Sequence, residues 1–304
     1  MKQIVECVPN FSDGRNRQTI DRLSAAIESV SQSYVLGTHV DKDHNRSVIT
    51  LVSTPENVAS AAVRAVATAA TLIDLRGHTG EHPRIGATDV LPFVPVRGVT
   101  MDQCVDLAHA AGEQIARDLE IPVYFYERAA LRPERTRLEH VRQRGFEDLK
   151  SSISVDPARA PDLGPRRLHE NAGAIAIGAR PFLIAFNVNL RTSDIAVARL
   201  IARALRERDG GLPFVKALGF ELQSRGLVQV SMNLIDFQRT GLAEVFAVVR
   251  QKAASMQVEI AGAEIVGLVP EAAFDSGAAY VPFLENFSED LILENCLNKR
   301  IRGS

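Results

Sequence analysis

The order of hydrophobic patterns along this chain occurs twice, and this repetition constrains the fold more than any single residue. Over residues 2–96 the patterns indicate strand, helix, strand, strand, helix, strand, and the same order returns over residues 182–269 with different amino acids. Strands are indicated by alternating apolar residues, and helices by apolar residues three and four positions apart. This is the ferredoxin-like order of elements. The sequence therefore predicts an α/β (α+β) protein built from two ferredoxin-like subdomains.

Local signals support several of these elements and suggest how the halves combine. Thr54 is a suitable N-cap, and Pro55 suits the first turn of the helix predicted to end at residue 73. The halves are predicted to divide into subdomains 1–177 and 178–304. Each sheet has one face for its helices and a second face that something must cover. Two such sheets facing one another would leave a ligand cleft between them.

A connector is predicted between the two halves. Residues 131–144 are dense in charge, and residues 155–167 contain Pro157, Pro161 and Pro165. We expect a solvated helix followed by an extended crossing. Because glutamates interleave with the arginines, a salt-bridged exposed face is favoured over a nucleic-acid surface.

Composition and charge exclude several classes of partner. The 304 residues are 46% hydrophobic and 24% charged with a formal net charge of −2, which is typical of a globular protein. No net positive field would attract nucleic acid or an anionic membrane, and no apolar stretch is long enough to span a bilayer. The first residues lack a signal-peptide pattern, and Cys7, Cys104 and Cys296 form no CxxC motif. These features predict a cytoplasmic protein without a nucleic-acid or membrane partner.

The densest group of reactive side chains lies in Gly80-Glu81-His82-Pro83-Arg84-Ile85-Gly86-Ala87-Thr88-Asp89-Val90. A helical pattern precedes this segment and an apolar run follows it, so we expect a loop between two fixed elements. His82 is a candidate acid–base because imidazole can accept and return a proton near neutral pH. Glu81 and Asp89 could orient that imidazole, and Arg84 could clamp a substrate carboxylate. The same three charges could instead hold the loop through internal salt bridges.

A second polar group surrounds His39. Alternation along a strand places His39 and Asp41 on one face, and Asp43, His44, Asn45 and Arg46 follow. Their spacing is not that of typical metal ligands, so no metal site is predicted here.

Motifs spread along the chain resemble those of the glutamate formiminotransferase (glutamate formimidoyltransferase) family. They are Val5-Glu6-Cys7-Val8-Pro9-Asn10-Phe11-Ser12-Asp13-Gly14-Arg15-Asn16, the run Gly80 to Val90, Pro95-Val96-Arg97-Gly98-Val99-Thr100-Met101, Phe182-Leu183-Ile184-Ala185-Phe186-Asn187-Val188-Asn189-Leu190, Gln229-Val230-Ser231-Met232-Asn233-Leu234 and Ile265-Val266-Gly267-Leu268-Val269-Pro270. Their order and number make the resemblance far more specific than one motif would. Because the sequence stops at Ser304, we expect a single-domain form without the cyclodeaminase domain of the animal members.

The resemblance implies a metal-free transfer of the formimino group from N-formimino-L-glutamate to N5 of tetrahydrofolate, giving 5-formimino-tetrahydrofolate and L-glutamate. This reaction belongs to histidine degradation and one-carbon metabolism. His82 corresponds to the catalytic histidine of the family. Animal members carry an aspartate, thought to assist that histidine, where this chain has His39, and Asp41 could substitute from the same strand face.

The resemblance also implies a folate site and a homodimer. The segment that lines the folate site corresponds to Leu163, Gly164, Pro165, Arg166, Arg167, Leu168, His169, Glu170, Asn171 and Ala172. A plain interdomain crossing is the alternative reading of that segment.

Two other functions remain open from the sequence. A related folate reaction on 5-formyl-tetrahydrofolate is one of them, because formyl and formimino groups are nearly isosteric. A non-catalytic folate-binding module is the other, which the presence of His82 disfavours.

Overall fold

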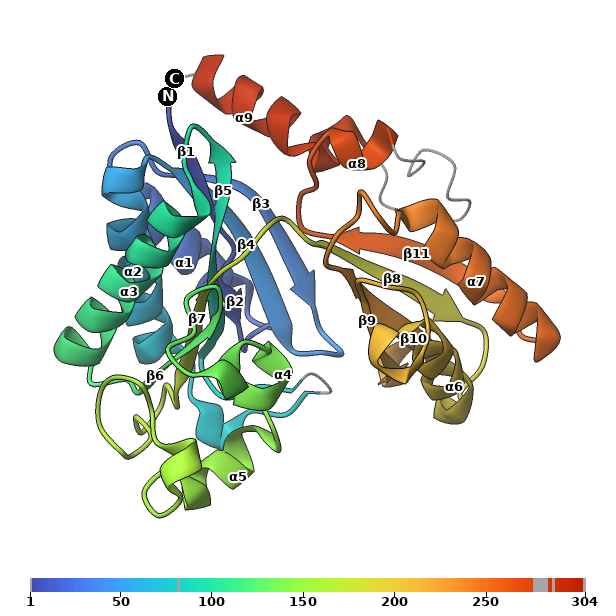
Figure 1. Ribbon diagram of the computed structural model, residues 1–304, viewed down its shortest axis with the longest axis horizontal. Coiled ribbons are helices and arrows are strands. Elements are labelled where there is room, and N and C mark those ends of the chain that lie inside the picture. Colours follow the sequence, from blue (N-terminus) through green and yellow to red (C-terminus); the bar gives the residue numbers. More distant parts are fainter. Residues whose placement is uncertain (1, 81–82, 276–283, 286–287, 303–304) are drawn as a thin grey trace. The chain divides into compact units, whose positions relative to one another are not determined.

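The computed structural model describes residues 2–80, 83–275, 284–285 and 288–302 (Figure 1). Contacts between Cα atoms divide the chain into two compact units, Met1–Arg180 and Pro181–Ser304. The domain boundary after residue 177 stays a prediction.

The first unit is built on a seven-stranded sheet. Its strands are β1 (Ile4–Cys7), β2 (Asn10–Phe11), β3 (Tyr34–Asp41), β4 (Arg46–Ser53), β5 (Thr88–Arg97), β6 (Val123–Glu127) and β7 (Ile175–Ala179). β3, β4, β1 and β5 lie side by side in antiparallel pairs. This is the strand order of a ferredoxin-like sheet, and β7 and β6 then extend it in parallel. The short β2, inserted between β4 and β5, was not predicted.

Three long helices cover one face of this sheet (Figure 1). They are α1 (Arg17–Glu28), α2 (Pro55–Leu72) and α3 (Met101–Asp118). Pro55 stands in the first turn of α2 as predicted, and Thr100 and Gln103 form a reciprocal capping box at the start of α3. Phe11, Leu51 and Phe93 are among the fully buried side chains that join sheet and helices. Burying each such side chain stabilises the fold by roughly 1.5–3 kcal/mol.

The connector differs from its prediction. Instead of one solvated helix it forms short elements, namely the 3-10 turns η2 (Pro133–Arg135) and η3 (Pro157–Arg159) and the helices α4 (Leu138–Val141) and α5 (Gly145–Ser152). Val141, Leu149 and Ile153 form a second apolar cluster with Tyr124 and Tyr126 of β6. The connector is therefore packed on the first unit.

Arginines hold the connector in place. The Arg135 side chain is buried, forms an ion pair with Asp162 at 2.6 Å, and donates to the carbonyls of Ala158 and Ala160. Its guanidinium lies 4.9 Å from the centre of the Tyr124 ring. An arginine suits this position because its several N–H donors can satisfy loop carbonyls that no β-ladder pairs.

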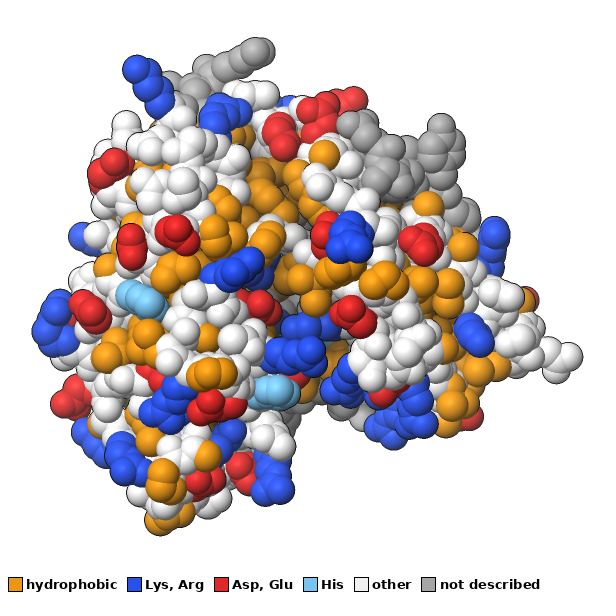
Figure 2. Space-filling view, viewed as in Figure 1, with side chains coloured by type: hydrophobic (Ala, Val, Ile, Leu, Met, Phe, Trp, Pro, Cys, Tyr) orange, Lys and Arg blue, Asp and Glu red, His pale blue; other side chains and the backbone are white. Residues whose placement is uncertain are grey.

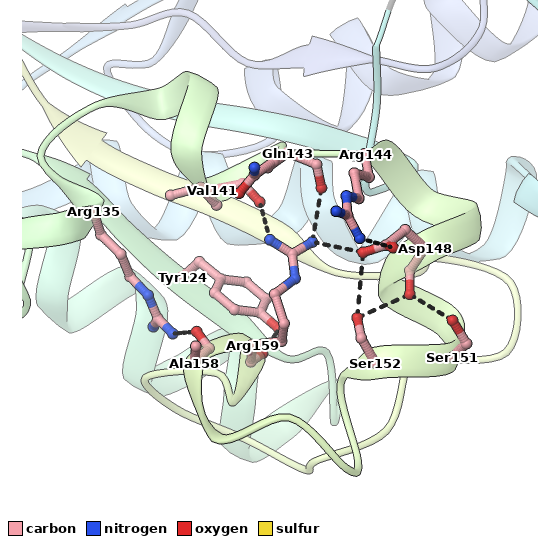
Figure 3. A network of polar contacts seen from close by, with 10 residues as sticks. All are labelled: Tyr124, Arg135, Val141, Gln143, Arg144, Asp148, Ser151, Ser152, Ala158 and Arg159. Atoms are coloured by element: carbon pink, nitrogen blue, oxygen red, sulfur yellow. Dashed lines mark hydrogen bonds and ion pairs between the residues drawn. The ribbon is translucent and has the colours of Figure 1, made fainter.

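Arg159 extends this network to α5 (Figure 3). Its guanidinium donates to the carbonyl of Gln143 at 3.0 Å, and its own carbonyl accepts the Tyr124 hydroxyl at 2.6 Å. Burial raises the pKa of Tyr124 to about 12, so this hydroxyl stays protonated and donates at neutral pH. The connector is thus fixed to β6 by hydrogen bonds as well as by apolar packing.

The second unit repeats the ferredoxin-like order. Its elements are β8 (Ile184–Leu190), α6 (Ile195–Leu205), β9 (Val215–Leu222), β10 (Leu227–Leu234), α7 (Leu242–Ser255) and β11 (Ile260–Val266), followed by α8 (Ala272–Asp275) and α9 (Leu293–Arg302). The antiparallel sheet has the order β11-β8-β10-β9. Phe186 and Val188 of β8 face a core shared with α6 and α7. The prediction of an α+β protein with two ferredoxin-like sheets is confirmed.

On the face drawn in Figure 2, Lys or Arg and Asp or Glu side chains of the first unit are interspersed. Among the described residues, no helix combines the length and the apolar character needed to cross a bilayer.

Candidate functional site

The loop that carries residues 81–82 is held on its N-terminal side by Asn45. Glu81 and His82 themselves lie outside the described residues. Asn45 Nδ2 donates to the carbonyl of Thr79 at 2.9 Å, and Asn45 Oδ1 accepts the backbone N–H of Gly14 at 3.0 Å. At Gly80 a Cβ atom would lie 2.5 Å from the carbonyl oxygen of His44. Glycine at position 80 therefore lets the loop rest directly on the β3–β4 turn.

His78 adds a second tie to the same turn. Its Nε2 lies 3.0 Å from the carbonyl oxygen of Asn45, so Nε2 carries the proton because a carbonyl only accepts. Burial, the largest cause, lowers the pKa of His78, and Arg84 and Arg15 act in the same direction. His78 Nδ1 is buried without a hydrogen-bond partner among the described residues. His78 is therefore a neutral donor to the turn at neutral pH.

Arg84 closes the loop from its other end. Its Nη2 donates to the carbonyl of His78 at 3.1 Å and to Glu147 of α5 at 2.9 Å. The guanidinium also lies 5.9 Å from the centre of the Phe146 ring. These contacts match the loop-holding alternative for Arg84, and its role as a carboxylate clamp stays a prediction.

Asp89 anchors the segment that follows. Its side chain is fully buried, and Oδ1 accepts the backbone N–H of Ile85 at 2.9 Å. Oδ2 lies 3.1 Å from Arg46 Nη1 and 2.7 Å from Arg142 Nη2. Burial, followed by repulsion from Arg142, lowers the pKa of Arg46 to about 10, so Arg46 keeps its charge at neutral pH. Asp89 thus ties the loop to β4 and to the connector, and its role in orienting His82 stays a prediction.

His39 and Asp41 lie on one face of β3. They pair in register with Val48 and Arg46 of β4, which are themselves two residues apart. Asp41 Oδ1 also accepts the backbone N–H of His44 at 2.8 Å. This hydrogen bond shapes the turn on which the loop rests. The assisting roles of His39 and Asp41 stay predictions.

Segment 163–172 begins with a contact to β6, because Leu163 forms a β-bridge with Val123. The carbonyl of Leu163 accepts the N–H of Val123 at 3.0 Å, and Gly164 has a φ of 84°, which suits glycine. Arg166 is exposed, whereas Pro165 is partly buried. Arg167 lies 3.3 Å from Glu120.

The second half of this segment contacts the backbone on both sides of the loop. The carbonyl of Asn171 accepts the N–H of Leu75 at 3.0 Å, and that of Ala172 accepts the N–H of Ala87 at 2.8 Å. Two side chains lie nearby: Glu170 forms an ion pair with Arg76 at 2.7 Å, and His169 Nδ1 accepts the N–H of Ala172 at 3.1 Å. Leu168 packs against the core. The segment predicted to line the folate site is therefore joined to the segments before and after residues 81–82.

Sequence reasoning missed several residues that build this loop. His78 and Arg142 were not proposed, although His78 lies close to His82 in the sequence. Arg142 was expected on a solvated face because glutamates surround it. Its partner Asp89 is distant in the sequence, and no local pattern indicates that pairing.

Comparisons with known proteins cover both units. The family model "Formiminotransferase domain, N-terminal subdomain" matches residues 4–180, and "Formiminotransferase domain" matches residues 185–299. A glutamate formimidoyltransferase from Thermoplasma acidophilum is 45% identical over 97% of this chain and 98% of its own length. The glutamate formimidoyltransferase of Streptococcus pyogenes serotype M1 is 42% identical, with 98% and 99% covered. The formimidoyltransferase-cyclodeaminase of Rattus norvegicus is 43% identical, but this chain covers only 53% of it. These matches extend over both units, and the chain belongs to the formiminotransferase family.

Proposed function

We propose that this protein transfers the formimino group of N-formimino-L-glutamate to N5 of tetrahydrofolate, giving 5-formimino-tetrahydrofolate and L-glutamate. The observation that carries the proposal is the similarity, over nearly the full length of each chain, to two proteins named glutamate formimidoyltransferase. In histidine degradation and one-carbon metabolism this reaction transfers a one-carbon unit to folate.

The chemistry needs one group that moves a proton between two nitrogens. N5 attacks the amidine carbon, and a new C–N bond forms as the C=N bond becomes single. The acid–base group then takes the proton of N5 and delivers a proton to the glutamate nitrogen of the tetrahedral adduct, after which the bond to that nitrogen breaks as the C=N bond re-forms. A single imidazole can perform both transfers in turn, and we assign this role to His82. Glu81, Asp89, His39 and Asp41 are proposed to assist it.

Anchoring of the loop supports this assignment. Hydrogen bonds hold the described backbone at Thr79 and at Ile85, on either side of residues 81–82. A catalytic group must be held within about half an ångström of its working position, which such anchors favour. Segment 163–172, which we propose binds folate, is hydrogen-bonded to the same stretch at Leu75 and Ala87.

Three further features belong to the proposal. Acid–base catalysis is the only assistance that the proposed mechanism uses, so we propose that the reaction needs no metal ion. We also propose a homodimer, from the family resemblance, and a cytoplasmic location, which agrees with the free thiols of Cys7, Cys104 and Cys296.

The test is to incubate the purified protein with formiminoglutamate and tetrahydrofolate and to measure 5-formimino-tetrahydrofolate and glutamate. Equal amounts of both products support the proposal. Transfer from 5-formyl-tetrahydrofolate alone would favour the related folate reaction, and folate binding without any transfer would favour a binding module.

A further inference from the structure

One side chain of the first unit joins three segments that are distant in the sequence. Asn45 stands in the turn between β3 and β4, Gly14 follows β2, and Thr79 belongs to the loop that carries residues 81–82. Asn45 Oδ1 accepts the backbone N–H of Gly14 at 3.0 Å, and Asn45 Nδ2 donates to the carbonyl of Thr79 at 2.9 Å. All three residues belong to the first unit, so these contacts hold within that unit alone.

The two neighbours admit only one orientation of the Asn45 amide. A backbone N–H only donates, so that of Gly14 must face the amide oxygen. A backbone carbonyl only accepts, so that of Thr79 must face the amide nitrogen. Both conditions select the same orientation, and the amide is therefore fixed at both of its ends.

The backbone at this position explains why the residue is an asparagine. Asn45 has a φ of 47°, in the left-handed region. Asparagine adopts this region more readily than most residues other than glycine. Glycine would suit the turn but has no side chain, and an ionised aspartate would accept from Gly14 but could not donate to Thr79. Asparagine therefore satisfies the turn and the loop together.

The backbones around Asn45 are packed too closely to shift independently. A Cβ atom at Gly14 would overlap the carbonyl oxygen of Asp41, and one at Gly80 would lie 2.5 Å from the carbonyl oxygen of His44. The segments that Asn45 joins thus rest directly on the β3–β4 turn. A hydrogen bond between such segments determines where the loop backbone lies.

Two other contacts tie the loop to this turn, but they use other atoms. Arg15 Nε donates to the carbonyl of Lys42 at 3.1 Å, and its Nη1 donates to the hydroxyl of Thr79 at 3.4 Å. His78 Nε2 donates to the backbone carbonyl of Asn45 at 3.0 Å. The carbonyl of Thr79, shortly before His82 in the sequence, is held by the Asn45 side chain.

We infer that Asn45 is a positioning residue for the formimino transfer, which holds through Thr79 the loop from which His82 acts. This inference rests on the proposed function, in which His82 moves the proton. Asn45 itself transfers no proton in this role. Its loss should lower the rate rather than the affinity for folate, because misplacement of a catalytic group by about 1 Å can lower a rate about a hundredfold.

The test compares kcat and the folate dissociation constant of Asn45→Gly and Asn45→Asp with those of the parent. Asn45→Gly removes both side-chain bonds, keeps the left-handed turn without strain and changes no charge. Asn45→Asp keeps the acceptor for Gly14 and removes the donor to Thr79. The backbone carbonyl that accepts from His78 is present in both variants. Each should lower kcat about 10- to 100-fold and change the folate dissociation constant by less than about 3-fold.

Asn295→Asp is the matched control. Asn295 Nδ2 donates to the carbonyl of Glu289 at 3.2 Å in the second unit. This substitution therefore removes a donor to a backbone carbonyl and adds a negative charge, as Asn45→Asp does. It should leave kcat at the parental value.

A double-mutant cycle separates positioning from a general effect on the fold. In a His82→Ala background, Asn45→Gly should lower kcat little further, because no imidazole remains to be positioned. A general loss of active protein would lower kcat by the same factor in both backgrounds, which would overturn the inference.

Two other results would also overturn it. One is parental kcat in Asn45→Gly, and the other is parental kcat in Asn45→Asp beside a slow Asn45→Gly, since the bond to Gly14 would then be the important one. Formimino transfer by the parent is measured first and tests the proposed function. Parental transfer with unaffected Asn45 variants would reject this inference alone.

Discussion

The carboxylate of Asp89 accepts the backbone N–H of Ile85 at 2.9 Å, and Ile85 follows closely after His82 in the sequence. The same carboxylate forms ion pairs with Arg46 and Arg142. One buried side chain therefore joins the proposed catalytic loop to β4 and to the connector.

Replacing Asp89 by Asn should lower the free energy of unfolding by roughly 3–5 kcal/mol, because the substitution leaves two arginines without their shared buried carboxylate. Urea unfolding measures this change. Asp21→Asn is the control, since Asp21 pairs with Arg17 on an exposed face and should matter by less than about 1 kcal/mol. Equal effects of the two substitutions would show that Asp89 is not an anchor.

We expect Arg135 to be a second anchor, which holds the proposed folate segment in place. Arg135→Met should destabilise the protein by roughly 3–5 kcal/mol, since Asp162 would lose the closer of its two arginine partners. Limited proteolysis should cut residues 155–167 faster in this variant than in Arg137→Met, whose side chain is exposed in the parent. If Arg135→Met is less stable but its residues 155–167 are cut at the same rate as in Arg137→Met, Arg135 does not anchor this segment.

His78 should make stability depend on pH. Its pKa is lowered in the folded state, so the unfolded chain binds a proton more readily. The contribution of neutral His78 is present above its ordinary pKa and is lost as the pH falls below that value. The free energy of unfolding between pH 8 and pH 5, chosen to bracket a histidine pKa of about 6.5, should therefore fall more steeply in the parent than in His78→Asn. Parallel curves would contradict this account.

The predictions from the sequence agree best with the structure for those helices and strands that local periodicity determines. Alternation and helical spacing indicate both ferredoxin-like repeats, because each half packs its own helices on its own sheet. The buried arginines of the connector could not be predicted in this way. Arg135 and Arg142 look solvated beside Glu134 and Glu139, and only the fold brings Asp162 and Asp89 to them. The side chains of Asn189 and Gln229 likewise meet only through strand register.

Chelation should leave the transfer reaction intact. The proposed mechanism uses only acid–base catalysis to assist the transfer, so dialysis against a strong chelator should not change kcat. A stoichiometric metal ion whose removal abolishes turnover, and whose return restores it, would contradict the metal-free mechanism.

The central claim is that His82 moves the proton, and kcat of His82→Ala with formiminoglutamate and tetrahydrofolate tests it most directly. We expect kcat to fall about a hundredfold or more, the usual contribution of a positioned acid–base group, while folate affinity and the free energy of unfolding change little. The parent should also show a limb near neutral pH in its kcat profile that the variant lacks, because the imidazole must be neutral to accept the first proton. A His82→Ala protein that turns over formiminoglutamate at the parental rate would contradict the account.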